Sequence, residues 1–201
     1  SLICGNKLFT TLALTKAGLP SPKTTAAFAP ETALKVLDIT GYPAVLKPTV
    51  GSWGRLVALV RDRESAQALI EAREEIRNAL LHVYYIQELV KRPPRDIRII
   101  VIGGETVAAS YRYAPPGEWR TNVARGGTSK PCPITPELQE LALKATEAVG
   151  GGVLAVDCME GPEGFLINEV NSTIAFRGIS STTEVNIAER ILDYAVGLVK
   201  K

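Results

Sequence analysis

The feature that most constrains this fold is the way its apolar runs are connected. Three pairs of short β-type runs, within residues 44–60, 97–113 and 153–170, are each joined by a glycine-containing turn or loop. Segments with helical periodicity separate most of the other runs. A tight turn joins antiparallel strands, whereas parallel strands need a long crossover. We therefore expect an α+β fold with mixed or antiparallel sheets and not a wholly parallel one.

The remaining segments complete this outline and suggest two units. Single strands are predicted at residues 24–28 and 84–90, and helices at residues 6–17, 30–39, 63–81, 136–149 and 184–199. A break near Ile86 divides the chain into a small subdomain, residues 1–86, and a larger one, residues 87–201. Ligands favour such seams, so we expect the site there.

Composition excludes several classes of partner. The 201 residues are 46% hydrophobic and carry a formal charge of +2, too little to gather nucleic acid or an anionic membrane surface. No apolar stretch approaches the roughly 20 residues that span a bilayer. Cys4, Cys132 and Cys158 are odd in number and widely spaced, which suggests neither a disulfide framework nor a zinc site and favours the cytoplasm.

A glycine-rich loop is the first candidate for ligand binding. Its residues are Gly51, Ser52, Trp53, Gly54 and Arg55, and they follow Lys47 closely. Glycines let backbone N–H groups approach phosphate oxygens, and lysine supplies a point charge. An ordinary hairpin turn also needs glycines, so the pattern leaves both interpretations open.

Acidic and amide side chains near the carboxyl end form a second candidate. Glu169 and Asn171 are two residues apart on one predicted strand and therefore face the same way. Asp157 joins them if the turn at Gly161 pairs the two strands. Carboxylate and amide oxygens are ligands that Mg²⁺ prefers, whereas the alternative is a structural salt bridge.

A third group combines cations and amides that could stabilise charge on a transferred phosphoryl group. It comprises Asp96, Arg98, Arg112, Asn122 and Arg125. A solvated basic face is the alternative. The sequence offers no convincing Ser–His–Asp or Cys–His pair, so a covalent protein nucleophile is not expected.

These clusters occur in the order found in a known family. Over essentially the whole chain the sequence resembles the RimK-like ATP-grasp ligases, and within that group LysX and ArgX. The segments that carry the resemblance are Cys4–Lys7, Val45–Pro48, the loop 51–55, Gln87–Val90, Asp96–Arg98, Asn122–Gly127 and Asn168–Asn171.

The resemblance implies roles for particular residues, with ATP and Mg²⁺ as cofactors. Lys7, Lys47 and the loop 51–55 would contact the nucleotide phosphates. A hinge that reads adenine would comprise Glu88, Leu89 and Val90, with Gln87 beside it and Asp96 also in the nucleotide site. The implied metal ligands are Asp157, Glu169 and Asn171. The groups around the acyl phosphate and substrate would be Arg98, Asn122 and Arg125.

The implied reaction joins α-aminoadipate, or as second choice glutamate, to the carrier protein LysW in lysine or arginine biosynthesis. A homo-oligomer is implied too. Asn6 stands where the family commonly has Asp, and the stretch Ser172–Arg177 is atypical. Arg177 and residues 180–183 could hold a side-chain carboxylate of the amino acid. The domain that usually precedes the first lysine in this family is expected to be absent.

Two rival interpretations remain from the sequence. One is a RimK-type ligase that adds glutamate to a protein tail or a cofactor. The other is an inactive nucleotide-binding module that has kept only partner contacts.

Overall fold

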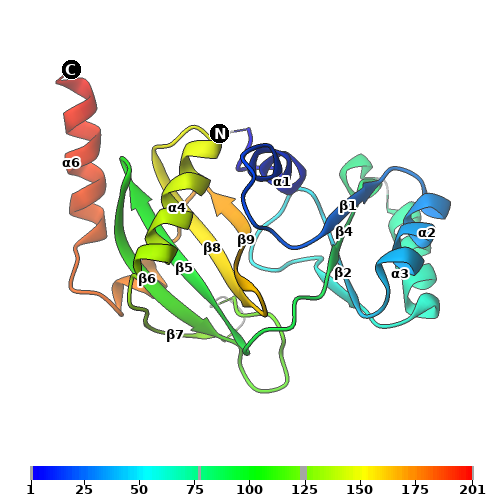
Figure 1. The fold of residues 1–201 in the computed structure, drawn as a ribbon. Coiled ribbons are helices and arrows are strands. Elements are labelled where there is room, and N and C mark those ends of the chain that lie inside the picture. The colour runs from blue at the N-terminus through cyan, green and yellow to red at the C-terminus, as the bar shows by residue number, and fades with distance from the viewer. Residues whose placement is uncertain (1, 77, 123–125, 201) are drawn as a thin grey trace.

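Two antiparallel sheets form the framework of the molecule (Figure 1). The computed structural model describes residues 2–76, 78–122 and 126–200. The smaller sheet has the order β1-β4-β2-β3, with strands β1 (Thr24–Ala27), β2 (Ala44–Lys47), β3 (Ala58–Val60) and β4 (Tyr84–Glu88). The larger sheet has the order β7-β6-β5-β8-β9, with strands β5 (Arg95–Ile102), β6 (Glu105–Tyr113), β7 (Thr128–Pro131), β8 (Val153–Gly161) and β9 (Gly164–Asn171). The α+β class with antiparallel sheets that the sequence predicts is confirmed.

Helices α2 (Pro30–Thr40) and α3 (Arg63–Glu75) cover one face of the smaller sheet (Figure 1). Leu37 and Ile70 pack from these helices against buried strand residues such as Leu46. Helix α3 ends earlier than predicted, because Ile76 takes an extended conformation, and a short 3-10 helix, η1 (Ala79–Leu81), follows. The start of α3 is fixed by a capping box between Asp62 and Ser65.

The larger sheet is covered on both faces. Helices α1 (Lys7–Lys16) and α4 (Pro136–Ala148) pack on one face, where Leu14 and Leu138 are buried together. Helices α5 (Arg177–Ser180) and α6 (Ile187–Val199) lie on the other face, where Ile179 and Ile187 are buried. The first helix therefore packs with the larger sheet, although it precedes the smaller one in the chain.

Helix α1 also touches the smaller sheet, because Thr11 Oγ1 lies 2.7 Å from Tyr85 Oη on β4. Strand β4, the last strand of the smaller sheet in chain order, extends to Glu88, two residues beyond the predicted boundary at residue 86. The division into residues 1–86 and 87–201 stays a prediction, now with α1 as an element shared by both units.

The three predicted hairpins all form. Strand β2 pairs with β3, β5 with β6 and β8 with β9, each antiparallel. Strand β7 was not predicted, because its sequence Thr-Ser-Lys-Pro lacks apolar alternation. It lies at a sheet edge, where a terminal proline is tolerated. Across the ranges that the structure describes, no helix has the length and apolar character that crossing a membrane requires.

Candidate active site

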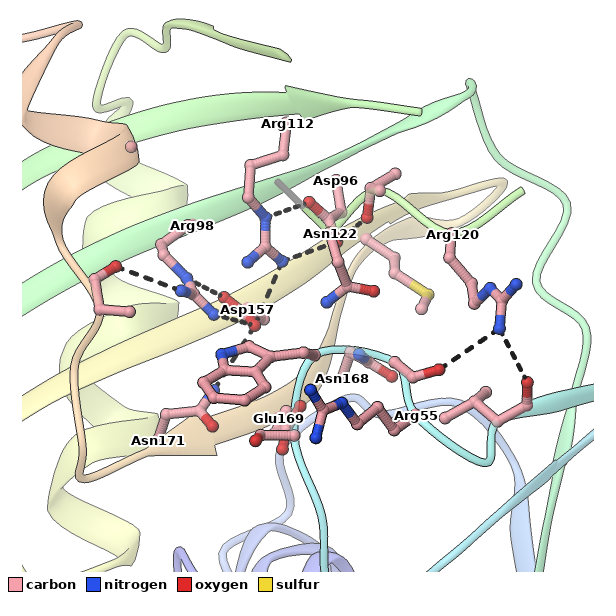
Figure 2. Close-up of a pocket in the computed structure, with 18 of the residues that line it drawn as sticks. Arg55, Asp96, Arg98, Arg112, Arg120, Asn122, Asp157, Asn168, Glu169 and Asn171 are labelled. Carbon is pink, nitrogen blue, oxygen red and sulfur yellow. Dashed lines mark hydrogen bonds and ion pairs between the residues drawn. The ribbon is translucent and has the colours of Figure 1, made fainter. Parts of the chain in front are cut away.

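A cavity of about 310 Å³ lies between the two sheets and takes side chains from both. On one side are Lys7, Lys47 and the glycine-rich loop. On the other side are charged and amide side chains of β5, β8 and β9, several of which are labelled in Figure 2. Described members of all three candidate clusters found in the sequence therefore meet in one place.

The glycine-rich loop is held by the first residue of α1. The backbone N–H of Lys7 donates to the carbonyl oxygen of Thr49 at 2.7 Å, and Lys7 Nζ donates to the carbonyl oxygen of Gly51 at 2.7 Å. Trp53 and Leu56 have φ angles of 59° and 56°, a left-handed conformation that is costly for residues with a side chain. Such local strain persists where surrounding contacts fix the backbone, and it is frequent at ligand sites.

Lys47 is a buried cation at the floor of the cavity. Its Nζ donates to Gln87 Oε1 at 2.5 Å and to Asn168 Oδ1 at 2.9 Å, so the two amides come from different sheets. Burial lowers the pKa of Lys47 to about 8, although the nearby Glu169 carboxylate acts in the opposite direction. Both hydrogen-bond partners are neutral, which leaves the ammonium charge available for an anion.

A network of buried ion pairs forms the opposite wall (Figure 2). Arg112 binds Asp96 through two hydrogen bonds of 2.7 Å, and its Nη2 lies 3.1 Å from Asp157 Oδ2. Arg98 binds both oxygens of Asp157, at 2.8 and 2.7 Å. Burial would raise the pKa of Asp157, but Arg112 and Arg98 together hold it below its ordinary value. The carboxylate is therefore ionised and fixed in position.

Sheet register explains why these charges meet. Asp96 on β5 lies opposite Arg112 on β6, and Arg98 on β5 lies opposite Asp157 on β8. Asp157 in turn pairs with Glu169 on β9, which confirms the pairing expected from the turn at Gly161. Directly opposed residues of unlike charge stabilise a sheet. The like-charged carboxylates Asp157 and Glu169 are instead offset by cations, Arg98 and Arg112 at Asp157 and Lys7 at Glu169.

A β-bulge brings an additional amide into the site. Asp157 pairs with Glu169, but the next residue, Cys158, pairs with Ile167, so Asn168 has no partner in the register. Bulges of this kind re-aim a side chain. Asn168 and Glu169 accordingly both line the cavity, although they are adjacent in sequence.

The donors fit Mg²⁺ chemically. Asp157 and Glu169 supply carboxylate oxygens and Asn171 an amide oxygen, and all three line the cavity. Asn171 Nδ2 lies 3.5 Å from Asp157 Oδ2, so its side chain is close to that carboxylate. Three or more His, Cys, Asp or Glu side chains do not gather into a metal cluster anywhere in the described part of the chain. A site with two carboxylates and one amide from the protein is consistent with Mg²⁺, because phosphate oxygens and water can complete the coordination shell.

Most of the predicted site residues line this cavity. They are Lys7, Lys47, Gly51, Ser52, Trp53, Gly54, Arg55, Asp96, Arg98, Asn122, Asp157, Glu169 and Asn171. The predicted hinge Glu88–Val90 is not among the lining residues, and Glu88 Oε1 accepts the backbone N–H of Lys23 at 2.8 Å. Gln87 does not line the cavity either, but its Oε1 accepts a hydrogen bond from Lys47 Nζ. Arg125 lies outside the described residues, and all of these roles stay predictions.

Sequence reasoning missed three contributors, Asn168, Arg92 and Arg120, which also line the cavity. Strand alternation places Asn168 and Glu169 on opposite faces, so the bulge could not be anticipated. Arg92 and Arg120 lie in irregular segments, where sequence gives no direction for a side chain. The only signal in the sequence for Arg120 was its position in the polar loop after β6.

Comparisons with known proteins agree with this geometry. The RimK-like ATP-grasp domain matches residues 4–195. "Alpha-aminoadipate--LysW ligase LysX" of Sulfurisphaera tokodaii is 40% identical over 199 residues, which cover 98% of this chain and 70% of that protein. "Glutamate--LysW ligase ArgX" of the same organism is 38% identical over 193 residues, or 96% of this chain and 68% of that protein.

A solved structure shows the same fold. The RimK domain ATP-grasp protein from Sphaerobacter thermophilus superposes with a TM-score of 0.76 at 24% identity, covering 96% of this chain and 67% of that one. The domain match spans nearly the whole described chain, and residues from several of the segments that carried the resemblance, among them Lys7, Lys47 and Glu169, line one cavity. On these grounds the chain belongs to the RimK-like ATP-grasp family.

Proposed function

We propose that this chain is an ATP-dependent carboxylate–amine ligase. It joins the amino group of α-aminoadipate, or of glutamate, to the side-chain carboxylate of the C-terminal glutamate of the carrier protein LysW. The names of the relatives at 38% and 40% identity support this choice of amino acid and carrier. The reaction belongs to lysine or arginine biosynthesis, and because it consumes ATP we assign it to the cytoplasm.

One observation carries the proposal. The cavity has the cations Lys7 and Lys47 and the glycine-rich loop on one side and a carboxylate–amide trio on the other, and Lys7 Nζ lies 3.4 Å from Glu169 Oε1. The first side suits phosphate oxygens, and the second would suit a divalent cation. Lys7 and Lys47 would hold the phosphates, while Asp157, Glu169 and Asn171 would hold Mg²⁺. Mg²⁺, when bound, would neutralise charge on the phosphate oxygens.

The chemistry needs two steps. An oxygen of the LysW carboxylate takes the γ-phosphoryl group, the bond to the β-phosphate oxygen breaks, and ADP leaves. The amine then attacks the acyl carbon, the carbon–oxygen bond to phosphate breaks, and inorganic phosphate departs as the amine loses a proton. Arg98, which lines the cavity and is held by Asp157, is placed to stabilise charge on the acyl phosphate.

The amino acid is selected near α5. Arg177 begins this helix and lines the cavity together with Thr173 and Gly178. A guanidinium there can bind a carboxylate in a bidentate manner, as the side chains of both candidate amino acids require. We rank α-aminoadipate first and glutamate second.

A ligase assay tests the proposal. Purified chain, ATP, Mg²⁺ and LysW are incubated with each amino acid, and ADP release and the mass of LysW are measured. The amino acid that is the substrate should raise the mass of LysW by the mass of one residue of that amino acid. Glu169→Gln should abolish the change, whereas Lys144→Met, on the exposed side of α4, should leave it intact.

Other outcomes would contradict the proposal in distinct ways. If neither amino acid causes ADP release in the presence of LysW, the LysW assignment is overturned. Glutamate transfer to another protein tail, in the absence of LysW, would favour the RimK-type alternative. ATP binding by calorimetry without ADP release under all conditions would favour the inactive module.

Self-association through α6 is part of the proposal. Leu192, Val196 and Val199 form an exposed apolar stripe at helical spacing, with exposures of 65%, 50% and 87%. An antiparallel pair of these helices would place Glu189, in the first turn, near Lys200 at the end of the other copy. Light scattering should report a dimer that Val196→Asp converts to a monomer, and a monomeric parent chain would contradict it.

A further inference from the structure

A segment of the larger unit reaches across the cavity to the glycine-rich loop. Arg120 lies in the loop that follows β6, and its Nη1 donates to the carbonyl oxygens of Gly54 and Val57, both at 3.3 Å (Figure 2). These two carbonyls lie in the loop that joins β2 to β3 in the smaller sheet. Arg120 therefore connects the two walls of the site directly.

Glu118 fixes the direction of the Arg120 side chain. Its Oε1 accepts Arg120 Nε at 3.0 Å, and its Oε2 accepts Arg120 Nη2 at 2.7 Å. The same Oε1 accepts the backbone N–H groups of Trp119 and Arg120, at 2.9 and 3.1 Å. The Arg120 hydrogen bond is the main cause of a Glu118 pKa lowered to about 2. With the Nε and Nη2 edge held by Glu118, Nη1 points to the glycine-rich loop.

The segment that carries Arg120 is anchored in the opposite wall. Thr121, which is 4% exposed, donates its hydroxyl to Asp96 Oδ2. Asp96 is bound by Arg112, which also contacts Asp157. A continuous chain of contacts thus runs from the carboxylate Asp157, a predicted metal ligand, through Thr121 and Arg120 to the glycine-rich loop.

Two other cations hold the same loop from other directions. Lys7 binds the carbonyl oxygen of Gly51, and the buried Arg73 donates to the carbonyl oxygen of Leu56 at 3.3 Å. These two cations come from α1 and α3, whereas Arg120 comes from the larger sheet. Only the Arg120 contact, among these three, joins the loop to the segment that also bears the candidate substrate residue Asn122.

We propose that Glu118 and Arg120 form a clamp that holds the glycine-rich loop closed over the nucleotide and ties its position to the Asp96–Arg112–Asp157 network. Arg120 is a positioning residue in this role and acts through the carbonyls of Gly54 and Val57. The nucleotide role of the clamp rests on the proposed function.

The first experiment measures loop order without nucleotide, so it does not depend on the proposed function. Amide hydrogen exchange is followed for residues 51–57 in the parent chain, Arg120→Met and the control Arg63→Met. Arg63 forms an exposed ion pair with Asp38 in the same unit and does not line the cavity. Exchange in the loop should be several-fold faster in Arg120→Met and unchanged in Arg63→Met. Equal exchange in all three would overturn the clamp.

The second experiment measures ATP binding by calorimetry in the presence of Mg²⁺. Arg120→Met should bind ATP about tenfold more weakly, the size expected for a lost hydrogen bond to a charged group. Arg120→Lys should recover part of the loss, because one ammonium can reach a carbonyl but cannot also match Glu118 in a bidentate manner. Unaltered affinity in Arg120→Met would overturn the clamp. Absence of binding by the parent chain would overturn the proposed function instead.

Two further readouts separate positioning from a merely structural role. In steady-state assays, Arg120→Met should raise KM for ATP much more than it lowers kcat, and a fall in kcat alone would contradict the clamp. Glu118→Gln should act in the same direction with a smaller effect. The double variant should be no worse than Arg120→Met, because Glu118 acts through Arg120. Additive losses would overturn that dependence.

Discussion

The two walls of the cavity are built in different ways. The glycine-rich wall is backbone held at single points, where Lys7, Arg73 and Arg120 each donate to main-chain carbonyls. The wall of the larger sheet consists of paired side chains, with Asp96 and Asp157 bound by arginines through bidentate contacts and only 5% and 4% exposed. One wall can move when single hydrogen bonds break, whereas the other is fixed.

This difference separates two requirements of the proposed reaction. A phosphate group that enters and leaves needs a loop that can open, and such regions belong to the less stable parts of a protein. Charge that develops during phosphoryl transfer needs groups already in position, because preorganised dipoles and charges do not have to rearrange. Substitutions in the two walls should therefore differ in whether they affect stability or activity.

The largest effect is expected in the fixed wall. Arg112→Met would leave Asp96 buried without its bidentate partner, and breaking such a pair costs about 3–5 kcal/mol of unfolding free energy. Urea denaturation measures this loss. Arg190→Met, which removes an exposed ion pair with Glu105, should cost less than about 1 kcal/mol. A similar small loss in both variants would remove the distinction between the walls.

The next effect is on activity. Lys47→Met should lower the rate of ADP formation about 100-fold, the scale for losing one preorganised electrostatic contact. The fold should persist, because Lys47 pairs with the neutral amides of Gln87 and Asn168 and leaves no carboxylate unpaired. Circular dichroism checks the fold and a coupled assay the rate. Normal activity in this variant would exclude Lys47 from phosphate binding.

A smaller effect on stability is expected at Gly127. A Cβ atom there would lie 2.7 Å from the carbonyl oxygen of Thr121 and 2.9 Å from that of Tyr113, so backbone would have to move. Gly127→Ala should cost about 2 kcal/mol, as overpacking generally does. Gly104→Ala is the matched control, because its Cβ meets nothing within 4 Å and only its φ of 86° is strained. The control should lose less stability, and the reverse order would contradict the close packing of this loop.

The smallest effect concerns pH. The pKa of Lys47 is lowered to about 8, so the side chain is charged below that pH and neutral above it. Phosphate binding uses the charged form, and KM for ATP should therefore rise about tenfold between pH 7 and pH 9. Lys47→Arg keeps its charge over this range and should show a flatter profile. An equally steep profile in Lys47→Arg would place the titration on another group.

The sequence predicted the fold better than the contacts within the site. Hairpins are local, and glycine-containing turns between apolar runs predicted all three. Strand β7 and helix α5 were missed, because residues 128–131 lack alternation and residues 177–180 form a single turn. The pairing of Asp157 with Glu169 could be predicted from the turn between their strands.

The ion-pair network could not be predicted in the same way. Arg98 meets Asp157 because β5 pairs with β8, strands that are separated by 50 residues and by α4. A single sequence does not say which nonadjacent strands will pair. Arg120 could not be directed at the glycine-rich loop either, because the two units must first be placed against each other.

The bulge at Asn168 has a consequence for how the chain tolerates deletions. Removing Asn168 would make the ladder regular and would leave the residues between it and the turn on their present faces, because Asn168 has no partner in the register. Ile167, which is 1% exposed, would stay in the hydrophobic core, but the hydrogen bond from Lys47 to Asn168 would be lost. A deletion inside the turn, residues 161–164, would leave the inward side chains where they are. The tip of this hairpin can thus vary in length during evolution, whereas the one extra residue in its middle can be lost without disturbing the core but only at the expense of the cavity, to which it contributes an amide.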